Sequence, residues 1–253
     1  MVNYIICSVE RTGSTLLSTL LEHTGELGRP IVEPFNMQVE AEAQRTHAFT
    51  SYDAYLEHVT ARAATPNGVA GINLMWRHLA RLMARLRARH GDTGTDLDLL
   101  RRHFPRLQHF ILTERRDVIA QAVSWAIAYQ TDCWRSTDPG NGARPHYDFA
   151  LINTLHQNAV ADAFGWETWF AANGIRPHRF VYEDWVRDQA AAVAGASELI
   201  RGAAAPAADA VLALRRQSTT LNEDWRSRYV DDLAAYLESA PGGQPAPVTG
   251  PAT

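Results

Sequence analysis

The sequence predicts an α/β fold in three layers, in which a central parallel sheet is flanked by helices. Two observations support this prediction. Short apolar runs alternate with longer segments of helical spacing, which is the pattern of parallel sheets with crossover helices. In addition, residues 4–9 and 108–113 are apolar runs that each lead through a polar turn into a helix. In parallel sheets such turns lie at the carboxyl edge, where ligands bind.

Length and composition are those of one globular domain. The chain has 253 residues, of which 46% are hydrophobic and 21% charged, so we expect a single domain over residues 1–240. Residues 241–253 are rich in Pro, Gly and Ala, which predicts a disordered tail. A net charge of -4 argues against nucleic acid as a partner.

Targeting signals and cysteine usage indicate a cytoplasmic protein. The sequence has no leader-like start and no apolar run of the roughly 18 residues that a membrane span needs. Its two cysteines, Cys7 and Cys133, form neither a disulfide framework nor a zinc site. We therefore expect no membrane partner and no metal.

The first strand–turn–helix unit predicts an anion site. Gly13 permits backbone conformations that other residues resist, and Ser14 and Thr15 can cap a helix over residues 15–23. The free N–H groups of the first helical turn point back at the loop. Arg11 adds a positive charge with planar, forked donors beside them.

The anion differs from the triphosphate of a Walker loop. That loop needs a Lys after its last Gly, whereas Ser14 fills this place and the chain contains no Lys. The segment Arg-Thr-Gly-Ser-Thr-Leu-Leu resembles the 5′-phosphosulfate loop of the P-loop-like sulfotransferases, most closely of the Stf0-like family, typified by a trehalose 2-sulfotransferase. The resemblance implies a sulfotransferase-like fold. It also implies that PAPS (3′-phosphoadenosine 5′-phosphosulfate) binds to Arg11, Thr12, Gly13, Ser14 and Thr15.

Two residues near this loop depart from the family pattern. Glu10 stands where the family usually has Pro, and an acid beside an anion site must point away from the anion or contact another group. Asn73, in a strand expected over residues 68–74, stands about where the family has Lys. This substitution removes a positive charge near the acceptor.

Glu33 is the candidate catalytic base. It lies in a Gly- and Pro-rich loop over residues 25–36, in the run Gly-Arg-Pro-Ile-Val-Glu-Pro-Phe. The family has Gly-x-Pro-x-Glu-Tyr-Phe here, and its Glu is taken as the base. Glu33 matches that Glu if one residue is inserted before it and Pro34 replaces the Tyr. His146 and His156 are the alternative bases.

The strand over residues 108–113 leads into a second loop. Arg116 and Ser124 are eight residues apart, so that an Arg at the strand end and a Ser on the next helix can close on one phosphate. This spacing resembles the 3′-phosphate site of sulfotransferases, which distinguishes PAPS from ATP. Arg115 is the alternative to Arg116.

The remaining segments predict mainly helices. A polar stretch from Cys133 to His146 suits a flap over a site. Arg216 and Gln217, ahead of Asn222 and Trp225, resemble a family segment that closes on the nucleotide; helix capping and packing is the alternative. We also expect helices over residues 38–44, 52–62 (capped by Ser51), 76–90, 149–170 and 190–214, a strand over 177–182, and a final helix that begins at Arg226.

The resemblance implies a PAPS-dependent sulfotransferase. It would transfer a sulfuryl group to a hydroxyl of a carbohydrate or small natural product and leave PAP as product. Glu33 would act as the base and Arg11 would stabilise the sulfuryl and leaving-group charge. The resemblance also suggests a homodimer. An amine acceptor stays open, as does an inactive nucleotide-binding protein; a nucleotide kinase is disfavoured because the chain has no Lys.

Overall fold

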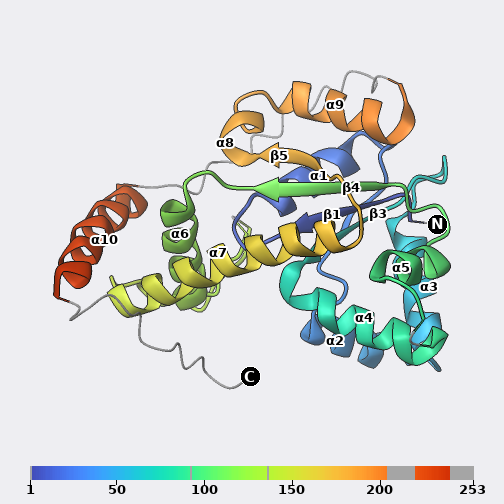
Figure 1. Cartoon of the computed structure of the whole chain (residues 1–253), viewed down its shortest axis with the longest axis horizontal. Helices are drawn as coiled ribbons and strands as arrows, with labels where there is room; N and C mark the ends of the chain where they lie inside the picture. The colour runs from blue at the N-terminus through green and yellow to red at the C-terminus, as the bar shows by residue number, and fades with distance from the viewer. Residues whose placement is uncertain (1, 92, 136, 204–219, 240–253) are drawn as a thin grey trace. The chain divides into compact units, whose positions relative to one another are not determined.

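The computed structural model describes residues 2–91, 93–135, 137–203 and 220–239. The chain forms two compact units, the first of Met1–Arg116 with Asp162–Ala213 and the second of Asp117–Ala161 with Leu214–Thr253. The helices and strands are labelled in Figure 1. Within the described residues, every helix is too short or too polar to cross a membrane.

The first unit is built around a parallel sheet of five strands in the order β2-β3-β1-β4-β5. All four strand pairs are parallel, and Tyr4 at the start of the central strand lies opposite Gly71 on one side and His109 on the other. The predicted α/β class with a parallel sheet is therefore confirmed. The strands are β1 (Tyr4–Ser8), β2 (Ile31–Val32), β3 (Gly71–Met75), β4 (His109–Glu114) and β5 (His178–Val181).

Helices cover both faces of this sheet and complete the three layers, as Figure 1 shows. Alternation along β1 divides the core, because Ile5 and Cys7 pack on one face while Tyr4 and Ile6 pack on the other. The first face packs against α2 (Met37–His47), α3 (Tyr52–Ala63), α4 (Trp76–His90), α5 (Asp96–His103) and the end of α7 (Phe149–Ala172). The second face packs against α1 (Ser14–His23), α8 (Tyr182–Trp185) and α9 (Gln189–Arg201).

The second unit contains α6 (Val118–Thr131), the first part of α7 and α10 (Thr220–Ser239). Its core joins Trp125, Ile152 and Tyr229. The Tyr229 hydroxyl donates to Asn153 Oδ1 at 2.9 Å, and the Tyr147 hydroxyl donates to Asp232 Oδ2 at 2.7 Å. The buried Tyr229 and the partly buried Tyr147 therefore each have a polar partner.

Several predicted elements agree with the structure and others need correction. The helix over residues 76–90 has the predicted bounds, and Ser51 caps α3 by accepting a hydrogen bond from the Ala54 amide. The segment expected as a loop over residues 25–36 contains the short strand β2. The final helix begins by Thr220, not at Arg226, so that Asn222 and Trp225 are helical. Of the helix expected over residues 190–214, the described part ends at Arg201.

Candidate active site

The loop between β1 and α1 has a backbone shape that depends on glycine. Gly13 has φ +84°, and a Cβ at this position would lie 2.6 Å from Tyr182 Cδ2. Leu17 N–H donates to the Gly13 carbonyl at 3.0 Å, so the amides before Leu17 precede the first intrahelical bond. Such amides at a helix N-terminus form a ready site for an anion. The backbone of this loop is thus suited to an anion.

The side chains of this loop differ in part from the predicted roles. Gly13 occupies the N-cap position and no side chain caps α1, so the capping role expected of Ser14 and Thr15 is wrong. The backbone at Gly13 is left-handed and Tyr182 packs against it, and both features favour glycine at the cap position. Thr12 is buried, and its hydroxyl donates to the Val9 carbonyl at 2.8 Å. Thr12 therefore holds the shape of the loop.

The second loop contacts the first at the ends of neighbouring strands. The hydroxyls of Thr12 and Thr113 lie 2.8 Å apart, and Arg115 Nη1 donates to the Arg11 carbonyl at 3.3 Å. The Arg115 guanidinium also lies 5.1 Å above the centre of the Tyr182 ring, at cation–π distance. Arg115, the alternative to Arg116, is thus part of the first loop's surroundings.

Arg116 lies at the end of the first unit and is 61% exposed in its side chain. Its guanidinium donates two hydrogen bonds to the Asp184 carboxylate, at 3.2 and 2.6 Å. These hydrogen bonds hold the pKa of Asp184 below its usual value. Its predicted partner Ser124 belongs to α6 in the second unit, so the joint phosphate site stays a prediction.

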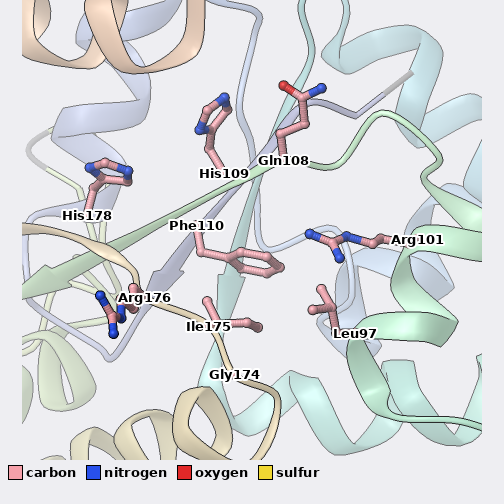
Figure 2. A pocket seen from close by; sticks show the side chains of 9 residues that line it. All are labelled: Leu97, Arg101, Gln108, His109, Phe110, Gly174, Ile175, Arg176 and His178. Atoms are coloured by element: carbon pink, nitrogen blue, oxygen red, sulfur yellow. The ribbon is translucent and has the colours of Figure 1, made fainter.

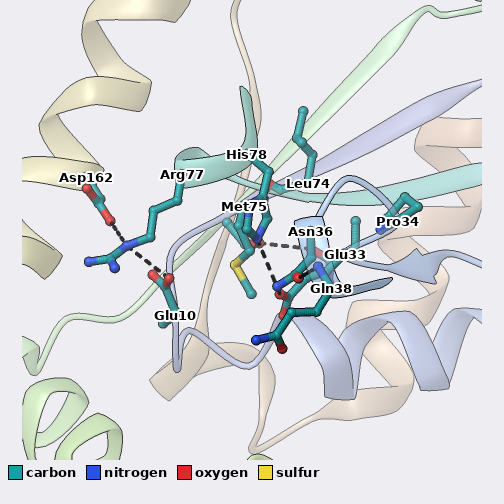
Figure 3. A network of polar contacts seen from close by, with 12 residues as sticks. Glu10, Glu33, Pro34, Asn36, Gln38, Leu74, Met75, Arg77, His78 and Asp162 are labelled. Atoms are coloured by element: carbon teal, nitrogen blue, oxygen red, sulfur yellow. Dashed lines mark hydrogen bonds and ion pairs between the residues drawn. The ribbon is translucent and has the colours of Figure 1, made fainter. Parts of the chain in front are cut away.

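Glu33 follows β2 at the carboxyl edge of the sheet (Figure 3). Its backbone has φ +52°, an uncommon conformation that ends the extended backbone of β2 at this residue. Asn36 Nδ2 donates to Glu33 Oε2 at 3.4 Å, and His78 Nε2 lies 3.5 Å from the same oxygen. Two polar groups therefore orient the predicted base, and His78 comes from the first turn of α4.

Glu10 joins a second polar network at the same edge. Arg77 lies between two acids in Figure 3, with Nε 3.1 Å from Glu10 Oε1 and 3.0 Å from Asp162 Oδ2. Burial raises the pKa of Glu10 to about 7 even though Arg77 acts to lower it. Burial also raises the pKa of Asp162. Glu10 therefore does contact another group, as an acid next to an anion loop requires.

Asn73 forms part of the buried floor beneath the loops. Ser8 Oγ donates to Asn73 Oδ1 at 2.9 Å, and Asn73 Nδ2 donates to Ser18 Oγ at 3.3 Å. The side chain is fully buried, so a neutral amide bridges β1 and α1 where the resembling family has a Lys. The hydroxyls of Ser8 and Ser18 pair with the Asn73 amide, so this buried polar side chain has its hydrogen-bond partners without a charge.

A cavity of about 220 Å³ lies elsewhere in the first unit, as Figure 2 shows. It opens beside the amino ends of β4 and β5, whereas the two loops leave the carboxyl ends. The predicted site residues do not line it, so we do not assign the reaction to this cavity. The lining residues are Leu97, Arg101, Gln108, His109, Phe110, Gly174, Ile175, Arg176 and His178.

The remaining predicted residues lie in other surroundings. Arg216 and Gln217 lie outside the described residues. Trp225 packs in the core of the second unit, which agrees with the packing alternative for this residue. The alternative base His156 lies 3.1 Å from the Tyr229 hydroxyl, and burial lowers its pKa. His146 accepts a hydrogen bond from Gln130 through its backbone carbonyl.

Sequence reasoning missed three residues of the site: Arg77, His78 and Asp162. The first two begin the helix after β3, and the rule that ligands bind at the carboxyl ends of parallel strands could have indicated them. Asp162 is 85 residues from Arg77 in the sequence. Its position within a long helix gives no local signal.

Comparison with known proteins decides the family. The model of the Stf0 sulphotransferase family matches residues 3–232. The chain belongs to the Stf0 sulphotransferase family. The family resemblance that the sequence predicted is thereby confirmed.

Individual Stf0 relatives are similar over nearly their whole length. A trehalose 2-sulfotransferase of Mycobacterium tuberculosis is 30% identical, over 89% of this chain and 93% of that protein. A trehalose 2-sulfotransferase of Mycolicibacterium smegmatis is 27% identical, over 90% of this chain and 94% of that protein. A solved sulfotransferase structure from Alicyclobacillus acidocaldarius shares 12% identity with a TM-score of 0.45, over 95% of this chain and 97% of that one.

Proposed function

We propose that this Stf0 protein transfers a sulfuryl group from PAPS to a hydroxyl of a carbohydrate or small natural-product acceptor and releases PAP. One observation carries the proposal: polar side chains follow four neighbouring strands at one edge of the sheet. Glu33 follows β2, Arg77 and His78 follow β3, Glu10 to Gly13 follow β1, and Arg115 follows β4. Membership of the family supports the reaction class. The names of the mycobacterial relatives support a sugar acceptor.

The first loop is the proposed binding site for the 5′-phosphosulfate. The amides at the start of α1, which precede its first intrahelical bond, and the charge of Arg11 would stabilise the sulfuryl oxygens and the leaving phosphate. Bound PAPS supplies the sulfuryl group. Thr12, Gly13, Ser14 and Thr15 complete the proposed loop site. Gly13 is suited to it because a larger residue would meet Tyr182.

The 3′-phosphate is the proposed ligand of Arg116 and Ser124. A guanidinium offers two parallel N–H donors to a phosphate, as Arg116 already offers them to Asp184. The Asp184 carboxylate would exchange places with the phosphate as the partner of Arg116. Arg216 and Gln217 are proposed to close on the nucleotide from the C-terminal segment. Together these contacts would discriminate PAPS from ATP.

Glu33 is the proposed catalytic base. The pKa of an acceptor hydroxyl lies far above 7, so a base must take its proton as the new bond forms. Glu33 lies at the carboxyl edge, and the Asn36 amide and His78 orient its carboxylate. A carboxylate held in this way can accept the proton without leaving the loop. We further propose that both units act as one sulfotransferase domain of a cytoplasmic homodimer.

A transfer assay with labelled PAPS and a panel of sugars and natural products tests the proposal. We expect labelled product, and binding of PAP in preference to ATP or AMP. Glu33→Gln should lower kcat by roughly a hundredfold or more while the affinity for PAP is kept. Equal affinity for PAP, ATP and AMP would overturn the proposal. Selective PAP binding without transfer would instead identify an inactive nucleotide-binding protein.

A further inference from the structure

The reaction proposed above assigns no binding or catalytic task to the network of Glu10, Arg77 and Asp162. Its two carboxylates are largely buried, with side-chain exposures of 16% for Glu10 and 14% for Asp162. Both lie within about 3 Å of one atom, Arg77 Nε. Its three members come from three elements, the loop after β1, the first turn of α4, and α7. Such a convergent contact holds the Glu10 carboxylate in one place.

This network lies beside the proposed base. Glu10 immediately precedes Arg11 of the first loop, and Arg77 immediately precedes His78, which contacts Glu33. The charge of Glu33 acts on Glu10 strongly enough to contribute to the rise of its pKa. The first turn of α4 therefore provides a partner for each carboxylate, Arg77 for Glu10 and His78 for Glu33. Both carboxylates lie at the carboxyl edge of the sheet (Figure 3).

The charges around Glu33 and Arg77 limit what the acceptor can carry, whereas the proposed anion loop begins at Arg11. Three carboxylates, Glu10, Glu33 and Asp162, stand against Arg77 and the ionisable His78. Carboxylates accept hydrogen bonds and repel other anions. A molecule that approaches the sulfuryl group along this edge therefore meets acceptors for its own donors. Hydroxyl and ammonium groups fit these surroundings, whereas a carboxylate or phosphate does not.

We propose that Glu10 is a second acceptor-binding residue, whose carboxylate accepts a hydrogen bond from the acceptor molecule and orients it toward Glu33. The site then selects uncharged or cationic polyhydroxylated acceptors over anionic ones. This inference rests on the proposed sulfotransferase function and adds a residue and a charge preference to it.

Protonation of Glu10 makes this contact depend on pH. The ionised form accepts the hydrogen bond, and its pKa of about 7 places the change within a testable range. The charged groups that face it are Arg77 from α4, Asp162 from α7 and Glu33 from the loop after β2. Acceptor affinity should fall as the pH drops below about 7. Loss of the Asp162 charge should move this change to lower pH, because that charge raises the pKa of Glu10.

Steady-state kinetics of Glu10→Gln test the proposal. We expect the acceptor KM to rise about tenfold or more, the size expected for a hydrogen bond to a charged group, with kcat and the KM for PAPS little changed. The fall of kcat/KM for the acceptor that sets in below about pH 7 should be absent in Glu10→Gln and should move to lower pH in Asp162→Asn. The panel consists of a neutral disaccharide, its amino analogue and its uronic-acid analogue. Discrimination against the uronic acid should weaken in Glu10→Gln.

Asp96→Asn is the matched control. Asp96 is 18% exposed and pairs with Arg87 near the other end of α4, so that it resembles Glu10 in burial and partner but not in position. This variant should keep the wild-type kinetics and pH profile. An unchanged acceptor KM and pH profile in Glu10→Gln would overturn the inference alone. A collapse of kcat with unchanged KM would also overturn it, because Glu10 would then act as the base. Absence of transfer by the wild type to every acceptor would overturn the proposed function and this inference with it.

Discussion

The ring of Tyr182 packs directly over Gly13, so closely that a Cβ on the glycine would lie 2.6 Å from Tyr182 Cδ2. Gly13→Ala should therefore combine backbone strain at positive φ with a steric clash and cost about 3 kcal/mol of stability. It should also abolish PAP binding, since the loop must shift. Thermal unfolding and calorimetric titration measure the two effects.

Gly25→Ala provides the control for this change. Gly25 also has positive φ, at +66°, but open space lies around its Cβ position. This variant should lose only about 1 kcal/mol from backbone strain and keep PAP binding. Equal losses of stability in the two variants would show that the contact with Tyr182 does not contribute to the cost of Gly13→Ala.

The raised pKa of Glu10 predicts a pH-dependent stability. The folded protein holds this proton up to about pH 7, whereas the usual value is 4.5. The folded state thus binds more protons, and stability falls as pH rises from 4.5 to 7. The loss amounts to about 3 kcal/mol above pH 7. Glu10→Gln lacks this titration, so its stability relative to the wild type should increase over the same range.

Urea unfolding at pH 4.5, 6 and 8 measures this difference. Asp96→Asn serves again as the control, because it removes an acid of similar burial from another Arg pair. A difference between Glu10→Gln and the wild type that stays constant with pH would mean that burial does not hold the proton on Glu10.

The exposed pair of Arg116 and Asp184 predicts a loss of binding without a loss of folding. Arg116→Ala should leave thermal stability nearly unchanged, because exposed ion pairs contribute little. It should weaken PAP by roughly tenfold or more and leave adenosine 5′-phosphosulfate, which lacks the 3′-phosphate, unaffected. Calorimetric titration with both nucleotides provides the measurement.

Asp184→Ala separates this effect from simple loss of the ion pair. The variant removes the carboxylate that competes for Arg116 and should bind PAP at least as tightly as the wild type. Weaker binding in both variants would show that the pair supports the loop and does not contact the phosphate.

Local sequence patterns predicted the regular elements well. The helix of α4 has its apolar residues Leu79, Leu82, Met83 and Leu86 at helical spacing, and these are the residues that the core buries. Its predicted bounds agree because Gly91 ends the helix directly after its last residue. The buried strands could be predicted in the same way, because a strand that is buried on both faces appears in the sequence as a continuous apolar run.

Features that depend on distant residues could not be predicted. Ile31 and Val32 are a strand only because β3 pairs with them. Tyr182, from another segment of the chain, leaves no room for a Cβ at the N-cap residue Gly13. Asp162 reaches Arg77 across 85 residues. In the candidate site, residue types of the loops were therefore foreseeable and their partners were not.

The hydrogen bonds between Thr12 and Thr113 and between Arg115 and Arg11 join the two loops at their bases. The loops cannot be displaced separately without breaking these bonds. A ligand that engages either one must therefore rearrange or stiffen both. Affinity measured with fragments of the nucleotide should then fail to add up to that of the intact molecule, because each fragment alone already bears the cost of ordering the pair.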